Sequence, residues 1–262
     1  MSSSAMHVAK TGLNAQQSRI QVISNNLANV NTTGFKRDRA NFETLLYQTW
    51  RPAGAQTSES TELTSGSSIG TGVRMVSTEK LYSQGALNPT DNSLDIAIDG
   101  DGFFQVLLPD GRMGYTRDGS FGVNSEGVIT TSSGYVLQPE ITIPGDASSI
   151  TISADGIVGV TAAGDVENQE VGQITLTSFV NPRGLTPIGE NFAVETQASG
   201  EPVVSVPNAD GAGSLVQGAL EASNVNVVQE LVEMIEAQRA YEVNSKSISA
   251  TDEMLRYLSN KL

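Results

Sequence analysis

From Val227 to Leu262 the chain reads VVQELVEMIEAQRAYEVNSKSISATDEMLRYLSNKL, a stretch without glycine or proline. An uninterrupted run of this length predicts a helix of roughly 54 Å, because each residue adds ~1.5 Å. Asn226, just before it, is a good N-cap residue. Every seventh position is apolar, and this spacing keeps one side of a helix facing a partner helix. The stripe consists of Val227, Met234, Tyr241, Ile248, Leu255 and Leu262.

The N-terminal end of the chain carries a second stripe with the same spacing. A helix is predicted there from about Ser4 to Asn29, because an asparagine-rich tract and Gly34 follow and both residue types tolerate the conformation that ends helices. A narrow apolar stripe must be covered, so we expect the two terminal helices to pack together as a coiled-coil-like core domain. The N-terminal stripe consists of Met6, Leu13, Ile20 and Leu27.

Between the helices the chain has the pattern of an antiparallel β domain. From about Val73 to Val206, turn pairs such as Asp110-Gly111 and Asp118-Gly119 alternate with short strand-like runs such as Phe103–Leu108. Short strands spaced by Asp-Gly turns indicate hairpins in a sandwich or barrel. No helical pattern lies between these runs, which predicts an α+β fold rather than a parallel α/β sheet.

The segment between the first helix and the β domain is harder to interpret. Phe42, Leu45, Leu46 and Trp50 stand at helical offsets and predict a short second helix that Pro52 ends. Residues 52–72, PAGAQTSESTELTSGSSIGTG, are rich in Ser, Thr and Gly. Their composition alone favours a flexible linker. The alternative is an extended hairpin or wedge that becomes ordered against another subunit.

These patterns divide the chain into three parts. Residues 1–34 and 214–262 form the predicted helical core domain. Residues 35–72 form a connecting segment with the extended Ser/Thr/Gly-rich stretch. Residues 73–213 form the predicted β domain.

Charge is unevenly distributed along the chain. The whole chain has a net charge of −14, whereas residues 1–51 contain six Lys or Arg against Asp38 and Glu43, a net of +4. The run from Lys36 to Arg39 is typical of nucleic-acid contacts. An acidic protein repels phosphate, so we expect this run instead to be solvated or to contact acidic neighbours in the same chain.

No arrangement of residues supports catalysis or cofactor binding. Gly66–Gly70 matches the G-x-S-x-G nucleophile pattern, but that motif needs a histidine base, and the only histidine is His7 in the N-terminal helix. Asp99–Gly102 resembles part of a calcium loop, yet Phe104 and Asp110 stand where that loop needs Gly and Glu. The chain has no cysteine. We therefore expect no enzyme activity, no metal, no cofactor and no small-molecule substrate.

The chain shows no membrane or secretory signal. No apolar run approaches the roughly 18 residues of a membrane span. The N-terminal sequence MSSSAMHVAKTGLNAQQ has no apolar core of the kind found in a cleavable signal peptide.

Two motifs, one at each end, resemble a known family. SNNLANVNTTGFKR at residues 24–37 resembles the N-terminal signature of the flagellar rod and hook proteins. EASNVN at 221–226 and EAQRAYEVNSK at 236–246 are similar to the C-terminal signature. The chain is too short for a typical hook protein and too long for a small proximal rod subunit. The resemblance is best to subunits of the distal rod, although Met6-His7-Val8 departs from the Leu-Trp pair usual in the family.

The resemblance implies a structural homopolymer: a rigid hollow rod that transmits torque and passes exported subunits. It also implies that the helical core domain lies inside, around the channel, and that the β domain faces outward. It implies as partners the proximal rod proteins, the hook protein, the P and L ring proteins and the flagellar export apparatus, with export lacking a cleaved signal peptide. No nucleic acid is expected. The expected subunit-interface residues are Met6, Leu13, Ile20, Leu27, Leu231, Met234, Tyr241, Ile248 and Leu255. The expected channel-lining residues are Gln238, Ser245, Asp252 and Ser259, and the expected stiffening-wedge residues are Gly54, Gln56, Thr64 and Gly66.

Two other interpretations fit less well. One is another rod or hook protein of the same family. The length and position of the 52–72 stretch favour the distal rod over this interpretation. The other is a secreted β-rich adhesin-type module with coiled-coil ends. A straight hollow filament distinguishes the rod from discrete adhesin-type trimers.

Overall fold

The computed structural model describes residues 2–54, 56–58, 61–62, 64–162, 168–209 and 211–259. The chain forms two compact units, here named the helical unit and the β unit. The helical unit contains the residues up to Ala28, Asp38–Glu79 and the residues from Asn226 onward. The β unit contains Asn29–Arg37 and Lys80–Val225. Each unit is thus assembled from stretches that lie far apart in the sequence.

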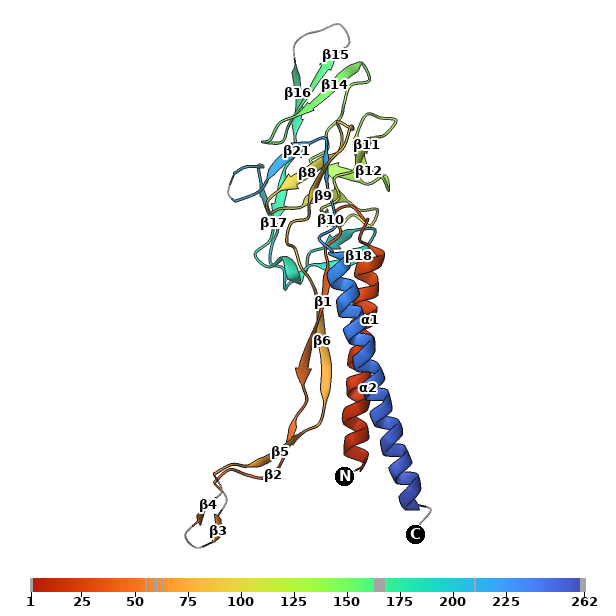
Figure 1. The fold of residues 1–262 in the computed structure, drawn as a ribbon. Helices are drawn as coiled ribbons and strands as arrows, with labels where there is room; N and C mark the ends of the chain where they lie inside the picture. Colours follow the sequence, from red (N-terminus) through yellow and green to blue (C-terminus); the bar gives the residue numbers. More distant parts are fainter. Residues whose placement is uncertain are drawn as a thin grey trace. The chain divides into compact units, whose positions relative to one another are not determined.

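Two long antiparallel helices, α1 (Ser2–Ala28) and α2 (Val227–Ser259), pack side by side in the helical unit (Figure 1). The Oδ1 atom of Asn226 accepts hydrogen bonds from the backbone N–H groups of Val228 (3.0 Å) and Gln229 (3.2 Å). The predicted pairing of the terminal helices and the predicted N-cap are both confirmed. In the described part of the chain, no helix is long and apolar enough to cross a membrane.

A two-stranded ribbon completes the helical unit. It is built from three successive strand pairs. The predicted short helix around Phe42–Trp50 is wrong, because Phe42 lies in the first strand, Trp50 lies in the second, and Leu45 and Leu46 form the link between them. A helix this short is marginal in water, whereas the strands gain backbone partners from residues 67–80. The pairs are β1 (Asp38–Thr44) with β6 (Val73–Lys80), β2 (Tyr47–Arg51) with β5 (Ser67–Gly70), and β3 (Gln56–Ser58) with β4 (Thr61–Glu62).

The described part of the 52–72 stretch is therefore an extended hairpin rather than an unstructured linker. The G-x-S-x-G sequence lies largely in β5, which pairs with β2. It has no helix after it, so the strand–turn–helix context of a hydrolase nucleophile is missing.

The β unit consists of short antiparallel strands, as the turn pattern predicted. Its largest sheet has seven strands in the order β11-β12-β13-β9-β10-β19-β18. The bounds are β9 (Phe104–Leu107), β10 (Met113–Thr116), β11 (Phe121–Val123), β12 (Ile129–Thr131), β13 (Val136–Gln138), β18 (Thr186–Gly189) and β19 (Phe192–Val194).

The remaining strands form one smaller sheet and three pairs. The three-stranded sheet is β14 (Ala147–Ile152), β15 (Ile157–Ala162) and β16 (Gln169–Gln173). The pairs are β7 (Leu87–Pro89) with β22 (Ala219–Glu221), β8 (Ile96–Asp99) with β21 (Ser214–Gln217), and β17 (Leu176–Ser178) with β20 (Val203–Ser205). A short 3-10 helix spans Pro182–Gly184.

The β unit has its own apolar core. Burying each large apolar side chain contributes ~1.5–3 kcal/mol, so this core stabilises the unit by itself. The Asp99–Gly102 sequence forms the turn between β8 and β9, with Gly100 and Gly102 at positive φ. The fully buried core residues include Ile96, Phe104, Val106, Ile129, Leu137, Val158, Ile174 and Leu176.

Candidate functional site

The α1–α2 contact is lined by small and polar residues of α2. Glu230 and Ala237 are fully buried, and Asn244 and Thr251 follow at the same seven-residue spacing and are half-buried. A Cβ added at Gly12 would lie 3.1 Å from Nδ2 of Asn244, so the helices approach closely there. The tightest seam therefore lies beside the predicted apolar stripe rather than on it.

The predicted subunit-interface residues are only partly covered within one chain. Leu231 and Tyr241 are exposed. The other seven are half-buried: Met6, Leu13, Ile20, Leu27, Met234, Ile248 and Leu255. Half-buried apolar side chains leave surface that another chain can cover, so their role between subunits stays a prediction.

A polar contact ties α1, β1 and α2 together at one end of the helical unit. Asn26 is buried, and its Nδ2 donates to the backbone oxygen of Asp38 (2.9 Å) and to Oε2 of Glu230 (3.2 Å). Its Oδ1 accepts the backbone N–H of Asp38 at 2.8 Å. Arg19 of α1 also forms ion pairs with Glu233 (3.7 Å) and Glu236 (3.8 Å). These contacts fix the register of the antiparallel helices.

A second apolar stripe, the outer stripe of α2, faces solvent. Helical spacing places Val228, Val232 and Ile235 on the side of α2 opposite the α1 contact, whereas Val243, Met254 and Tyr257 lie to one side of that contact. Val228 is 71% exposed and Val243 is 66% exposed, so little in the same chain covers them. The outer stripe consists of Val228, Val232, Ile235, Val243, Met254 and Tyr257. Apolar surface of this extent on one helix indicates a protein–protein contact.

The predicted channel-lining residues lie along a different side of α2. Gln238 and Ser245 are exposed. Asp252 is half-buried and pairs with Nε of Arg256 at 3.0 Å. The side chain of Ser259 lies outside the described residues. The described part of this set offers polar groups to solvent.

The predicted wedge residues belong to the ribbon. Gly54 has φ +80°, the left-handed conformation that side chains rarely adopt. A Cβ at Gly66 would lie 2.8 Å from the backbone oxygen of Arg51. Thr64 is exposed, and Gln56 lies in β3. The backbone geometry explains why bulky residues at Gly54 and Gly66 are expected to be tolerated poorly.

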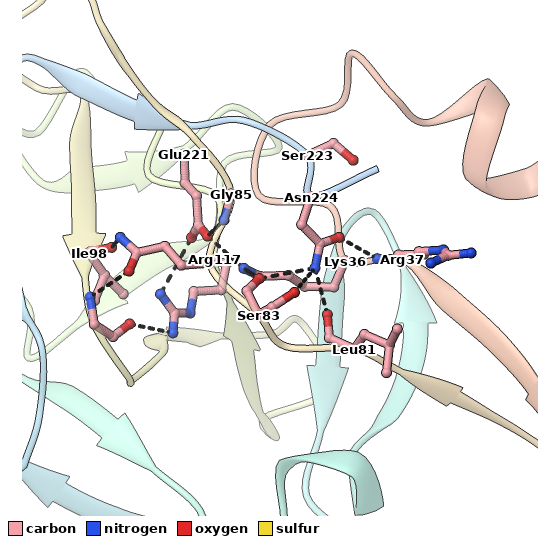
Figure 2. Close-up of polar contacts among 12 residues, drawn as sticks. Lys36, Arg37, Leu81, Ser83, Gly85, Ile98, Arg117, Glu221, Ser223 and Asn224 are labelled. Atoms are coloured by element: carbon pink, nitrogen blue, oxygen red, sulfur yellow. Dashed lines mark hydrogen bonds and ion pairs between the residues drawn. The ribbon is translucent and has the colours of Figure 1, made fainter. Parts of the chain in front are cut away.

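The β unit contains a buried charged cluster made of Lys36, Arg117 and Glu221 (Figure 2). Glu221 ends β22, and its Oε1 lies 2.6 Å from Nζ of Lys36. Its Oε2 lies 3.4 Å from Nη1 of Arg117. The backbone N–H of Gly85 donates to Oε1 at 2.8 Å. A single carboxylate thus binds two buried cations that are remote in sequence.

Backbone oxygens complete the cluster. Lys36 Nζ also donates to the oxygen of Ser83 (2.9 Å), and Arg117 Nη2 donates to the oxygen of Gly100 (2.8 Å). Burial lowers the pKa of Lys36 and of Arg117 below their ordinary values, and the charge of Glu221 offsets part of that shift. The carboxylate of Glu221 therefore offsets part of the free-energy cost of burying the two cations.

Asn224 joins the same chain segments through its amide group. Its Oδ1 accepts the backbone N–H of Arg37 (2.7 Å), and its Nδ2 donates to the oxygens of Leu81 (2.7 Å) and Ser83 (3.0 Å). The segment that follows α1 in sequence is thus held to the segment that precedes α2. Figure 2 shows this amide beside the charged cluster.

The basic run is used inside the protein, as the charge argument expected. Lys36 pairs with Glu221, and Arg39 forms an ion pair with Glu79. The clustering of Lys36, Arg117 and Glu221 was missed at the sequence level. No local pattern connects three positions this far apart, so only the fold brings them together.

Comparison with known proteins identifies the family. Three family models match: "Flagella basal body rod protein" at residues 6–36, "Flagellar hook protein FlgE/F/G D1 domain" at 97–160, and "Flagellar basal body rod FlgEFG protein C-terminal" at 216–261. The chain is 56% identical to the flagellar basal-body rod protein FlgG of Buchnera aphidicola subsp. Schizaphis graminum, over 97% of this chain and 98% of that protein. The chain belongs to the FlgG family of flagellar basal-body rod proteins.

Other relatives agree with this assignment. FlgG of Caulobacter vibrioides is 48% identical over 97% of this chain and 98% of that protein. The flagellar hook-basal body complex protein FlhP of Bacillus subtilis is 30% identical over 98% of each chain. The protein is a structural, non-enzymatic subunit of the distal rod. The resemblance inferred from the two terminal motifs is confirmed.

The three residues of the buried cluster fall in three different matched segments. Lys36 ends the first, Arg117 lies in the second and Glu221 lies in the third. The cluster therefore joins the three family segments of this rod subunit within the β unit.

Replacing Gly34 by alanine is expected to destabilise the β unit. Gly34 has φ +66°, and a Cβ there would lie 2.6 Å from the backbone carbon of Arg117. The left-handed conformation alone costs a non-glycine residue roughly 1–2 kcal/mol, and the backbone contact adds to that. Urea denaturation of Gly34→Ala measures the loss. Gly134→Ala is the matched control, because Gly134 also has positive φ (+86°) but no atom within 4 Å of the added Cβ. Equal losses in the two variants would show that the contact with Arg117 contributes nothing.

Proposed function

We propose that this subunit polymerises with copies of itself into a rigid, hollow, helical rod that transmits torque from the motor to the hook. The observation that carries the proposal is the apolar surface left open on the helical unit of a rod-family protein. The outer stripe of α2 and the half-buried stripe residues remain accessible in the single chain. Covering each such side chain contributes up to ~1.5–3 kcal/mol, which favours contacts between copies.

In this polymer the helical unit forms the inner part and the β unit faces outward. The predicted channel-lining set, Gln238, Ser245, Asp252 and Ser259, faces the channel through which exported subunits pass. Exposure of the polar residues Gln238 and Ser245 supports this placement. A polar wall keeps passing chains from adhering to it.

The proposal includes partners and a location. The rod contacts the proximal rod proteins at one end and the hook protein at the other, spans the periplasm, and turns inside the P and L rings. The flagellar export apparatus delivers the subunit without a cleaved signal peptide. Membership in a basal-body rod family supports these assignments.

Electron microscopy of the concentrated full-length protein tests self-assembly. Straight, hollow filaments are expected above a critical concentration. Discrete particles at every concentration, with the β unit folded, would rule out polymerisation by this chain alone.

Deleting Gln56–Thr64 is expected to leave a polymer that assembles but bends. The described part of this range, strands β3 and β4, belongs to the ribbon. In our proposal the ribbon is a wedge held between neighbouring subunits that prevents them from sliding. Persistence lengths of wild-type and deleted filaments, measured on micrographs, give the result. Replacing the same residues by a Gly/Ser sequence of equal length is the control for chain length. If the deleted polymer is as straight as the wild type, stiffness comes from the helical unit instead.

A further inference from the structure

The last part of the β unit, residues 214–225, is here named the closing segment. It supplies strand β21, which pairs with the buried strand β8, and strand β22, which pairs with β7. Leu215 of β21 belongs to the apolar core of the unit. The side-chain amide of Gln217 donates to the backbone oxygens of Ser93 (2.8 Å) and Ile150 (2.9 Å). The closing segment thus contacts several parts of the unit that precede it in the sequence.

The closing segment also carries the one carboxylate of the buried charged cluster. Glu221 lies 185 residues after Lys36 and 104 residues after Arg117 in the sequence. The side chains of both cations are only 3% exposed in the folded unit. A protein is synthesised from its N-terminus, so both cations are present long before the carboxylate that pairs with them. A β unit that formed in that interval would bury two positive charges beside each other.

The free-energy cost of that burial decides whether an incomplete β unit is stable. Burying an ion without its partner costs several kcal/mol, and the cluster contains two such ions. The exposed carboxylate of Asp101 also raises the pKa of Lys36 and of Arg117, but less than Glu221 does. A native domain is stable by only about 5–15 kcal/mol in total. The cost is therefore large enough to cancel the stability of a unit that lacks Glu221.

We propose that the buried cluster makes folding of the β unit wait for the closing segment. Before Glu221 is available, the unfolded chain keeps Lys36 and Arg117 in water and is favoured over a partly built core. Once Glu221 is in place, its carboxylate accepts hydrogen bonds from both cations and from the backbone N–H of Gly85 (2.8 Å). The benefit of the delay, an unfolded chain during export, rests on the proposed function, whereas the order of folding does not.

Charged residues suit this role better than apolar ones. Replacing a buried ion pair by apolar residues of similar volume often leaves a completed core equally stable. Apolar side chains, however, gain free energy from any burial, so a partial core made of them forms before the last strand is added. With Lys36 and Arg117 in the cluster, the partial core is penalised and the complete unit is not.

Cutting the full-length chain just before the closing segment tests the order of folding. A protease site is inserted after Ala209, an exposed residue between β20 and β21. The folded protein is cut there, and the two fragments are separated in urea and returned to buffer. Amide hydrogen exchange of β9 is then followed by mass spectrometry, because its neighbours in the sheet, β10 and β13, both lie in the N-terminal fragment.

The N-terminal fragment alone is expected to lose the protection of β9. Exchange there is expected to be about 100-fold faster, or more, than in the cut protein before separation, because the unit no longer folds. Adding back the C-terminal fragment is expected to restore the protection.

Variants separate the charge of the closing segment from its strands. A C-terminal fragment with Glu221→Gln is expected to leave exchange of β9 about 100-fold faster than the wild-type fragment does at the same concentration, as for the loss of one partner of a buried ion pair. Val228→Ala, at a residue of the same fragment that is 71% exposed, is the matched control and is expected to restore full protection. An N-terminal fragment with Lys36→Met and Arg117→Met is expected to exchange about tenfold more slowly than the wild-type fragment, because its partial core buries neither cation.

Three results would each overturn the inference. They are full protection of β9 in the N-terminal fragment alone, full protection with the Glu221→Gln fragment, and exchange as fast as wild type in the N-terminal fragment with Lys36→Met and Arg117→Met. The last of these would mean that the missing strands alone prevent folding. All these measurements use unassembled protein, so their failure leaves the proposed rod intact, and a lack of filaments in the microscope leaves the order of folding intact.

Discussion

Replacing Glu221 by alanine is expected to destabilise the β unit by about 3–5 kcal/mol, the usual loss when one partner of a buried ion pair is removed. Glu221 is fully buried and binds Lys36 at 2.6 Å and Arg117 at 3.4 Å. Without its carboxylate, two buried cations repel each other and the backbone N–H of Gly85 loses its acceptor. Urea denaturation of the full-length protein, followed by circular dichroism, gives the change in the free energy of unfolding.

Two comparisons isolate the effect of the charge. Glu201→Ala removes an exposed carboxylate from the same unit and is expected to change stability by less than ~0.5 kcal/mol. The double variant Glu221→Gln with Lys36→Met removes one charge of each sign. Its loss in the free energy of unfolding is therefore expected to be smaller than the sum of the losses in Glu221→Gln and Lys36→Met. A loss below ~1 kcal/mol in Glu221→Ala would show that water enters the cluster and replaces the carboxylate.

The parts of the fold that local sequence determines were predictable. Helix α2 follows from a long stretch without glycine or proline and from the cap at Asn226, which the structure confirms. The β unit follows from turns such as Asp110-Gly111, where Gly111 has φ +81°. These features depend on residues a few positions apart, so a single sequence contains all the information they require.

Features that depend on remote partners were not predictable in the same way. Residues 42–50 have helical apolar spacing, yet they form parts of two strands and the link between them, because residues 67–80 pair with those strands. On α2, the contact with α1 is made by Glu230, Ala237 and Asn244. Two of these residues are polar, so a search for apolar stripes does not identify them. The seam departs from an apolar pattern because small and polar residues allow close approach and specific hydrogen bonds, such as that of Asn26 with Glu230.

Replacing Ile248 by aspartate is expected to abolish polymerisation while the β unit stays folded. Ile248 is half-buried one helical turn beyond Asn244, whose amide lies against Gly12 of α1. Lys10, the Lys or Arg of α1 nearest to this level of the helix pair, is exposed to solvent. Arg19 already pairs with Glu233 and Glu236. Burying an unpaired charge costs several kcal/mol, which a helix that depends on packing cannot offset.

Separate measurements on the two units distinguish this effect from global unfolding. Helical circular dichroism and sedimentable polymer are both expected to fall in Ile248→Asp, whereas a protease-resistant fragment corresponding to Lys80–Val225 is expected to persist, because the apolar core of the β unit contains no helix residue. Val180→Asp places the same charge on a side chain of the β unit that is 88% exposed and is expected to assemble normally. Normal rods and motility with Ile248→Asp would mean that this side of α2 stays accessible to water in the rod. The stability of the helical unit would then come from the buried contacts of Asn26, Glu230 and Ala237 and not from the apolar stripe beside them.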